Sequence, residues 1–212
     1  MISHRFSRLF DVSALMPPRD FVPIGREPIC LEIGAGKGKH ALLFASQNPE
    51  CHLYAIERTH EKFTAFKKSF DAQPLTSLTP IHSDAICWSA YALFPNQVQK
   101  CFILYPNPEP KNKNQRFLNM PFFEFLLSRM SPNGQIIIAS NIDEYIQECQ
   151  VLLETVWHLP YSKRQIEPDS ARTHFEIKYL ARGEACWELV ITKPTHYHTR
   201  FDETLPLSWL PQ

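Results

Sequence analysis

The sequence predicts an α/β fold with a mostly parallel, doubly wound sheet, and three features of the chain lead to it. Short apolar runs of strand length alternate with longer amphipathic stretches of helical periodicity. A glycine-rich turn follows the first apolar run, and the last part of the chain changes from alternation to paired strands. The alternation predicts strands at residues 29–33, 52–57, 78–82, 101–105 and 135–139, and helices at residues 38–48, 60–72, 86–93, 120–130 and 142–157.

The end of the sheet is predicted to be antiparallel. Residues 174–181 and 185–192 read as two strands on either side of a tight turn, Arg182-Gly183-Glu184. A carboxyl-terminal antiparallel hairpin therefore closes the predicted sheet.

The length favours one folded domain with a flanking segment at each end. At 212 residues and 44% hydrophobic content, the chain can bury one core and is short for two. Residues 1–28 are rich in proline and are expected to form an irregular arm packed over the domain. Residues 29–193 make up the predicted domain, and residues 194–212, rich in Thr, His and Pro, are expected to be a poorly structured tail.

The composition limits the classes of partner. Lys plus Arg and Asp plus Glu both number 22, so an RNA partner would have to meet a local basic patch. No apolar run approaches the roughly 18 residues of a membrane helix, and the N-terminus lacks the apolar core of a signal sequence. We therefore expect a cytoplasmic protein that does not bind membranes.

The cysteines and histidines give no sign of a metal site. The six cysteines include no CxxC pair and are expected to be reduced, buried and structural. His196 and His198 have no acid or cysteine cluster nearby, so no metal is predicted. The oligomeric state is left open.

The glycine-rich turn is the most informative segment. Residues 31–38 read LEIGAGKG, with a glycine at every second position from Gly34 and the acid Glu32 at the end of the strand. Glycine takes positive φ without strain and lets the backbone approach a ligand at the carboxyl edge of a parallel sheet. A dinucleotide fingerprint, GxGxxG, would place its third glycine inside the helix. The order ExGxGxG is instead typical of S-adenosylmethionine sites.

A second acid supports this prediction. Glu57 closes the second predicted strand, about 20 residues after the glycines, where a carboxylate can accept both ribose hydroxyls of an adenosine. The alternative is a tight turn followed by a solvated acid.

Further motifs resemble one family. After the fourth predicted strand, residues 105–111 read YPNPEPK, and here the chain resembles the bacterial tRNA (guanine-N7)-methyltransferase family, whose segment reads roughly FPDPWPK. Ser83-Asp84-Ala85, before this segment, and the THFE of residues 173–176, after it, resemble further motifs of that family and keep the family's order. The resemblance covers about residues 29–192. It implies a Rossmann-like class I methyltransferase that uses S-adenosylmethionine and methylates N7 of a guanine in tRNA.

Carried over position by position, the resemblance implies the site residues. Asn107 takes the catalytic position at the reacting centre. The implied cofactor-binding residues are Glu32, Gly34, Gly36, Gly38, Glu57, Asp84 and Asn107, and the implied substrate-binding residues are Lys111, Asn141, Thr173 and Glu176.

Several of these positions have a purely structural alternative. Asp84 and Asn141 could each cap the helix that follows. Lys111 could be a solvated loop lysine, and Thr173 and Glu176 could be surface residues of a strand edge.

Departures from the family pattern leave the activity open. Asn107 and Asn141 stand where the family has carboxylates, and Glu109 stands where it has tryptophan. An amide can still accept a hydrogen bond, but it removes the charge that would balance a cationic guanine ring. The alternatives are therefore a methyltransferase acting on another RNA or on a small molecule, or a non-catalytic cofactor-binding paralogue.

Overall fold

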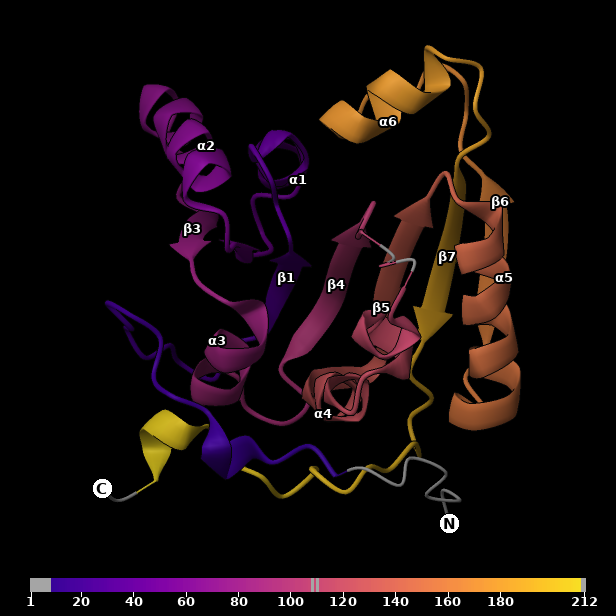
Figure 1. Cartoon of the computed structure of the whole chain (residues 1–212). Coiled ribbons are helices and arrows are strands. Elements are labelled where there is room, and N and C mark those ends of the chain that lie inside the picture. Colours follow the sequence, from indigo (N-terminus) through magenta and orange to yellow (C-terminus); the bar gives the residue numbers. More distant parts are fainter. Residues whose placement is uncertain (1–8, 108, 110, 211–212) are drawn as a thin grey trace.

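The computed structural model describes residues 9–107, 109 and 111–210, which form one seven-stranded sheet with helices on both faces (Figure 1). The strand order is β3-β2-β1-β4-β5-β7-β6. The strands are β1 (Ile29–Ile33), β2 (Leu53–Glu57), β3 (Leu78–His82), β4 (Val98–Leu104), β5 (Met130–Ser140), β6 (Tyr161–Gln165) and β7 (Trp187–Thr192). The helices are α1 (Lys39–Gln47), α2 (His60–Ala72), α3 (Ala85–Ala92), α4 (Phe122–Arg129), α5 (Asp143–Leu152) and α6 (His174–Leu180).

The predicted α/β alternation is confirmed. The first five strands pair in parallel, and β7 pairs antiparallel with both β5 and β6. β4 begins three residues before the predicted strand of residues 101–105. The predicted helix of residues 142–157 is α5 followed by a π-helical turn, Leu153–Trp157.

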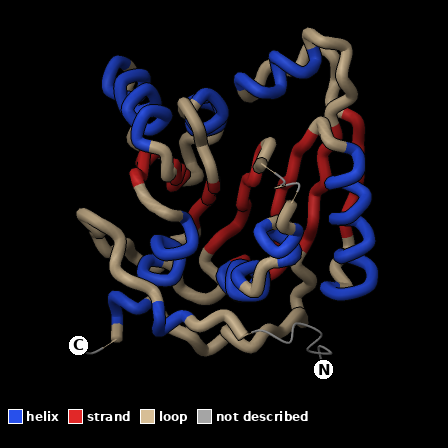
Figure 2. Tube along the Cα trace, in the orientation of Figure 1, coloured by secondary structure: helices blue, strands red, loops and turns tan. Residues whose placement is uncertain are grey.

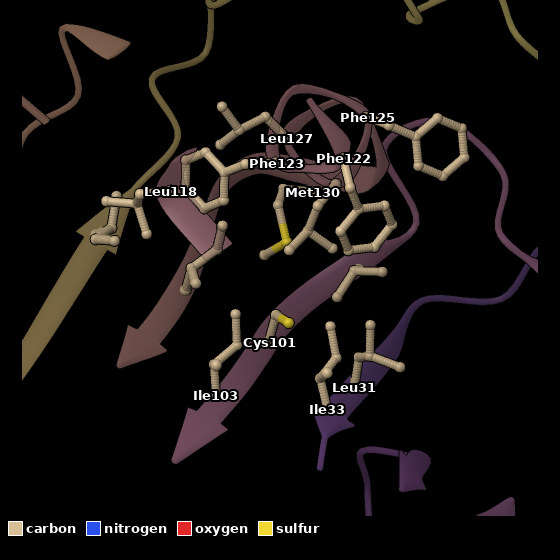
Figure 3. Close-up of a cluster of buried hydrophobic side chains, with 14 of the residues drawn as sticks. Leu31, Ile33, Cys101, Ile103, Leu118, Phe122, Phe123, Phe125, Leu127 and Met130 are labelled. Atoms are coloured by element: carbon tan, nitrogen blue, oxygen red, sulfur yellow. The ribbon is translucent and has the colours of Figure 1, made fainter. Parts of the chain in front are cut away.

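The core forms two layers because successive residues of a strand point to opposite faces of the sheet. Leu31 and Ile33 of β1 face α3, α4 and α5. Cys30, which directly precedes Leu31, points to the other face and packs against α1 and α2. Figure 3 shows the first layer, where the side chains of β1 and β4 lie opposite Phe122 of α4. The central strands are thus covered on both sides, as a parallel sheet requires.

The prediction of an antiparallel end to the sheet is confirmed, but its expected partner strand is wrong. Residues 174–180 form α6, and the antiparallel partner of β7 is β6, with Tyr161 opposite Ile191. Thr173 starts the helix because its Oγ1 accepts a hydrogen bond from the backbone N–H of Glu176 at 2.9 Å. Figure 1 shows α6 beyond the arrowheads of β4 and β5, on the same side of the molecule as α1 and α2.

The flanking segments run mostly as loops past the ends of the strands that are remote from α6 (Figure 2). Each contains a short 3-10 turn, Val12–Ala14 or Leu207–Trp209. The arm packs on the domain as predicted over its described part, with the ring of Phe10 5.7 Å from that of Phe122 and 6.2 Å from that of Phe201. Residues 1–8 of the arm lie outside the described residues. The expectation of a poorly structured tail is wrong for residues 194–210, because Phe201 is buried and Arg200 forms a two-pronged ion pair with Glu124.

The expectation that all six cysteines are reduced and buried is wrong for three of them. Cys30 and Cys51 form a disulfide with their Cα atoms 6.3 Å apart. Cys30 lies opposite Leu53 of β2, and Cys51 precedes Leu53 by two residues, so the two side chains meet on one face. Cys87 is a half-buried free thiol. The other three are buried and free, namely Cys101, Cys149 and Cys186.

Arg129 at the end of α4 joins the tail to the core. Its side chain is fully buried, and its guanidinium donates hydrogen bonds to the backbone oxygens of Leu93, Phe201 and Thr204 at 2.6 to 2.9 Å. A buried cation needs such acceptors because it has lost its hydration. Two of the three carbonyls belong to the tail, so the arginine fixes the tail against α4.

We expect Arg129→Met to lower the free energy of unfolding by about 3 kcal/mol, because three buried carbonyls would lose their donor. Urea titration followed by circular dichroism measures this, and limited proteolysis should cut the variant within the tail. Arg19→Met, at an exposed arm residue, is the control and should change stability by less than about 0.5 kcal/mol. Equal unfolding midpoints for the two variants would contradict the assigned role.

Candidate active site

The candidate site lies where the strand order reverses. β1 is flanked by β2 on one side and β4 on the other, and ligands of doubly wound sheets bind at the carboxyl ends of strands at such a switch point. Two adjoining pockets open there. One, which we call the α1–α6 pocket, has a volume of about 350 Å³ and lies between the glycine turn, α1 and α6. The other, the β4-loop pocket, has about 580 Å³ and extends from the glycine turn past β2 and β3 to the loop after β4.

The glycine turn brings backbone to the wall of both pockets. Gly34 and Gly36 line both, with φ of +78° and +59°. A Cβ built on either would meet no atom within 4 Å, so each faces open space of the pocket. A bound ligand can therefore approach the backbone at these two residues, as the motif predicts.

Gly38 lies where α1 packs on α2. It lines neither pocket, and a Cβ on it would lie 1.9 Å from Cδ2 of the buried Phe66. Its residue type is fixed by the close packing of α1 on α2, with φ of +79° at the helix start.

Glu57 lines the β4-loop pocket at the end of β2. One carboxylate oxygen accepts the backbone N–H of Gly36 at 2.9 Å, and the other accepts that of Thr59 at 2.6 Å. These bonds hold the acid against the glycine turn. Each oxygen keeps a second lone pair that can accept a hydroxyl from the pocket.

Asp84 lines the same pocket and combines both roles considered for it. Its Oδ1 accepts the backbone N–H groups of Ile86 and Cys87 at 2.9 and 3.3 Å, so it is the N-cap of α3. Its Oδ2 lies 3.8 Å from the guanidinium of Arg58, whose side chain is 81% exposed, and remains accessible from the pocket. One oxygen thus serves the helix and the other can serve a ligand.

Glu32 forms a buried pair with a residue that the sequence did not single out. Its Oε2 lies 3.0 Å from Nδ1 of His40, and both residues line the α1–α6 pocket. The imidazole packs with its centroid 4.7 Å from the ring of Phe102, which fixes its orientation. The one signal in the sequence for this contact is the position of His40, directly after the glycine turn at the start of the predicted helix.

The loop after β4 lines one end of the β4-loop pocket. Asn107 is exposed and Glu109 half-buried, and both line the β4-loop pocket together with Pro106 and Tyr105. Tyr105 has φ of +51°, which turns the chain sharply out of the strand. Its hydroxyl donates to Oε2 of Glu176 at 2.9 Å, and burial raises the pKa of this phenol well above its ordinary value.

Glu176 is fully buried and supports the site from behind. Arg172 donates to both of its oxygens at 2.9 and 3.1 Å, and Ser170 and Tyr105 donate as well. Burial alone would raise the pKa of this carboxyl, but the hydrogen bonds from Arg172 and Ser170 outweigh it and lower the pKa below 4.5. Arg172 also binds Glu188 of β7. The alternative of a surface strand edge is therefore wrong for Glu176, which holds α6 over the pockets. Thr173 lines the α1–α6 pocket, and Phe175 lines both pockets.

Three of the four implied substrate residues line neither pocket, namely Glu176, Lys111 and Asn141. Lys111 is exposed on the loop after β4 and lines neither. Asn141 follows β5 and donates from Nδ2 to Oε2 of Glu184 at 2.7 Å. It does not cap α5, whose N-cap residue is Ile142; the backbone N–H of Ile142 donates to the hydroxyl of Ser140 at 3.1 Å.

The described residues contain no group of three or more His, Cys, Asp or Glu side chains arranged to hold a metal ion. No helix among them combines the length and the apolar character needed to span a bilayer.

Comparison with known proteins identifies the family. A family model described as "Putative methyltransferase" (Methyltransf_4) matches residues 26–189. The chain belongs to this methyltransferase family. Relatives include the tRNA (guanine-N(7)-)-methyltransferases of Nitrosospira multiformis, 27% identical, and Thiobacillus denitrificans, 28% identical, each match spanning 78% of this chain and 75% of the relative.

Solved structures of methyltransferases share the fold. The 16S rRNA methyltransferase KamB superposes with a TM-score of 0.61 at 17% identity, over 79% of this chain and 88% of that one. Phosphoethanolamine N-methyltransferase 2 of Haemonchus contortus, in complex with S-adenosyl-L-methionine, superposes with a TM-score of 0.55 at 14% identity. The match covers 82% of this chain, which spans half the length of that enzyme. The prediction of a Rossmann-like, S-adenosylmethionine-dependent methyltransferase is confirmed.

Substitution of Gly36 should mainly affect cofactor binding, and substitution of Gly38 should mainly affect stability. We expect Gly36→Ala to weaken binding of S-adenosylhomocysteine at least tenfold while lowering stability by about 1 kcal/mol, the cost of a side chain at positive φ. Gly38→Ala should lower stability by about 3 kcal/mol because its methyl group would collide with Phe66. Calorimetry with the cofactor product and thermal unfolding separate the two effects. Equal loss of cofactor affinity in both variants, at equal stability, would contradict the distinction.

The buried carboxylate of Glu176 should make the free energy of unfolding depend on pH in the acid range. Because the folded state lowers the pKa of this carboxyl, its stabilising contribution is present above pH 4.5 and is lost as the pH falls through the lower, folded pKa. We expect Glu176→Gln to be about 3 kcal/mol less stable at pH 7, and the difference from wild type to shrink below pH 4.5. Urea titrations from pH 7 to pH 3 measure this. A difference that stays constant over this range, or an equal effect from the exposed control Glu144→Gln, would contradict it.

Proposed function

We propose that the protein transfers the methyl group of S-adenosylmethionine to N7 of a guanine in tRNA. The observation that carries the proposal is the continuity of the β4-loop pocket, which joins the acids at β2 and β3 to Asn107 and Glu109 after β4. Relatives that match most of the chain are named as tRNA (guanine-N(7)-)-methyltransferases. Modification of tRNA also accords with the cytoplasmic location expected from the sequence.

The pockets fit the proposed cofactor. The open backbone at Gly34 and Gly36 leaves room for it, and the second lone pairs of the Glu57 carboxylate can accept the ribose hydroxyls. Oδ2 of Asp84 can accept the adenine amino group. Glu32, oriented by His40, faces the α1–α6 pocket, where a carboxylate can accept the amino group of the methionine part. S-adenosylmethionine supplies the electrophilic methyl group on its sulfonium.

On the acceptor side, the residues need only hold the base. N7 of guanine carries a free lone pair at neutral pH, so no proton has to be removed before transfer. The bond from N7 to the methyl carbon forms as the bond from sulfur to that carbon breaks, and the positive charge passes from sulfur to the purine. Catalysis therefore consists of positioning and of stabilising the charge that develops on the ring.

Glu109 is a carboxylate that can hold the guanine and stabilise the positive charge on its ring. Guanine offers the N1–H and N2–H donors on one edge, which match the acceptors of a carboxylate and of the Asn107 carbonyl. Both side chains line the β4-loop pocket. The negative charge that the family has at position 107 is thus available two residues further along the same loop.

The direct test uses methyl-labelled S-adenosylmethionine and bulk tRNA from a strain that lacks the family enzyme. After digestion, labelled 7-methylguanosine is the expected product. Label in another nucleoside would move the reaction to a different acceptor. Absence of label in tRNA, with cofactor binding verified by calorimetry, would contradict the proposed function.

The acceptor loop predicts two opposite effects on methylation. We expect Glu109→Gln to lower kcat/KM for tRNA about 10- to 100-fold, the equivalent of losing one or two charge-assisted hydrogen bonds. Asn107→Asp should raise kcat/KM by restoring a charge next to the base. Neither change should alter the Kd of the cofactor more than about twofold. Glu50→Gln, at an exposed residue before β2, is the matched control. Unchanged turnover in Glu109→Gln would remove this residue from the acceptor site.

A further inference from the structure

Four lysines from four separate elements converge on the α1–α6 pocket. Lys37 belongs to the glycine turn, Lys39 is the first residue of α1, Lys62 lies on α2, and Lys178 lies on α6. We call these four residues the lysine rim. Among the described residues lining this pocket, Glu32 is the sole carboxylate, and it is already engaged by His40.

The lysine rim gathers cations without an ion pair around one pocket. Several cations elsewhere are neutralised by carboxylates, as in the ion pairs of Lys67, Lys113 and Lys163. None of the rim lysines forms an ion pair within the part of the chain that the structure describes. The arginines paired with acids are Arg58, Arg116, Arg164, Arg172, Arg182 and Arg200. A chain with equal numbers of acidic and basic residues therefore keeps unneutralised positive charge at the mouth of its site.

An exposed aromatic ring lies between the rim and the acceptor loop. Phe175 lines both pockets, is 41% exposed, and stacks at 6.0 Å on Tyr179 of the same helix. Aromatic faces beside lysines are the combination by which proteins bind single-stranded nucleic acid, because bases stack on the ring and phosphates pair with the cations. Lys62 also lines both pockets, so the basic surface continues to the acceptor side.

We propose that the lysine rim binds backbone phosphates of the RNA strand beside the target guanine, with Phe175 as a stacking face for a base. This rests on the proposed function, and it adds the part of the surface that holds the RNA. The start of α1 strengthens the attraction, since the positive end of the helix dipole points to the same pocket.

The test compares two double variants with equal loss of charge. Lys62→Gln with Lys178→Gln removes rim lysines from α2 and α6, and Lys68→Gln with Lys100→Gln removes exposed lysines from α2 and the first half of β4. Two probes are used, unmodified tRNA and a fluorescent single-stranded oligouridine. Binding is measured by anisotropy over a series of salt concentrations, and S-adenosylhomocysteine binding is measured by calorimetry.

We expect the rim variant to bind both RNA probes at least tenfold more weakly, with a salt slope smaller by roughly 1.4, about 0.7 for each lost phosphate contact. Its cofactor affinity should stay within twofold of wild type, and the control pair should match wild type throughout. Unchanged RNA affinity and slope in the rim variant would overturn the proposal, and so would a loss confined to cofactor affinity. Rim-dependent binding of oligouridine without any 7-methylguanosine in tRNA would uphold the rim and reject the proposed acceptor.

Discussion

The buried carboxylate of Glu176 is the interaction on which the arrangement of the site depends. It accepts hydrogen bonds from Arg172, Ser170 and Tyr105, and Arg172 continues to Glu188 of β7. A fully buried charge is tolerated only when its lone pairs are occupied, so these partners have to be in place together. The end of β4, the start of α6 and strand β7 are thereby fixed relative to one another. Phe175 and the loop of Asn107 face the pockets because this network holds their backbone from behind.

The other acids of the site combine structural and ligand-binding roles in a similar way. Glu57 holds the glycine turn through the N–H of Gly36, and Asp84 caps α3 with one oxygen. Such bonds fix the orientation of a carboxylate before a ligand arrives, which reduces the entropy lost on binding. The same bonds explain why a local structural role and a functional role are not alternatives for these residues. A ligand uses the lone pairs and the oxygen that the fold leaves accessible.

The sequence predicts the parts of the site that local patterns specify. Gly34, Gly36 and Glu57 lie in the cleft because a strand, a tight turn and a helix place them there irrespective of the rest of the chain. α6 could not be predicted in this way, since its apolar residues Phe175 and Ile177 alternate with polar ones in the period of a strand. In the structure both apolar side chains are exposed while the acid between them is buried, so tertiary contacts of Glu176 override the pattern. The pairing of Cys30 with Cys51 and the packing of the tail around Arg129 likewise depend on contacts between distant segments.

The two asparagines that depart from the family pattern differ in their surroundings. Asn107 is exposed in the β4-loop pocket, where a carboxylate would meet solvent. Asn141 donates its amide to Glu184 at 2.7 Å, and an aspartate there would place two carboxylates in contact. The amide at this position is therefore matched to a glutamate that already supplies the charge. Each neutral residue has a glutamate close to it, Glu109 two residues further along the loop or Glu184 across the hydrogen bond, but only Glu109 places its negative charge in the β4-loop pocket.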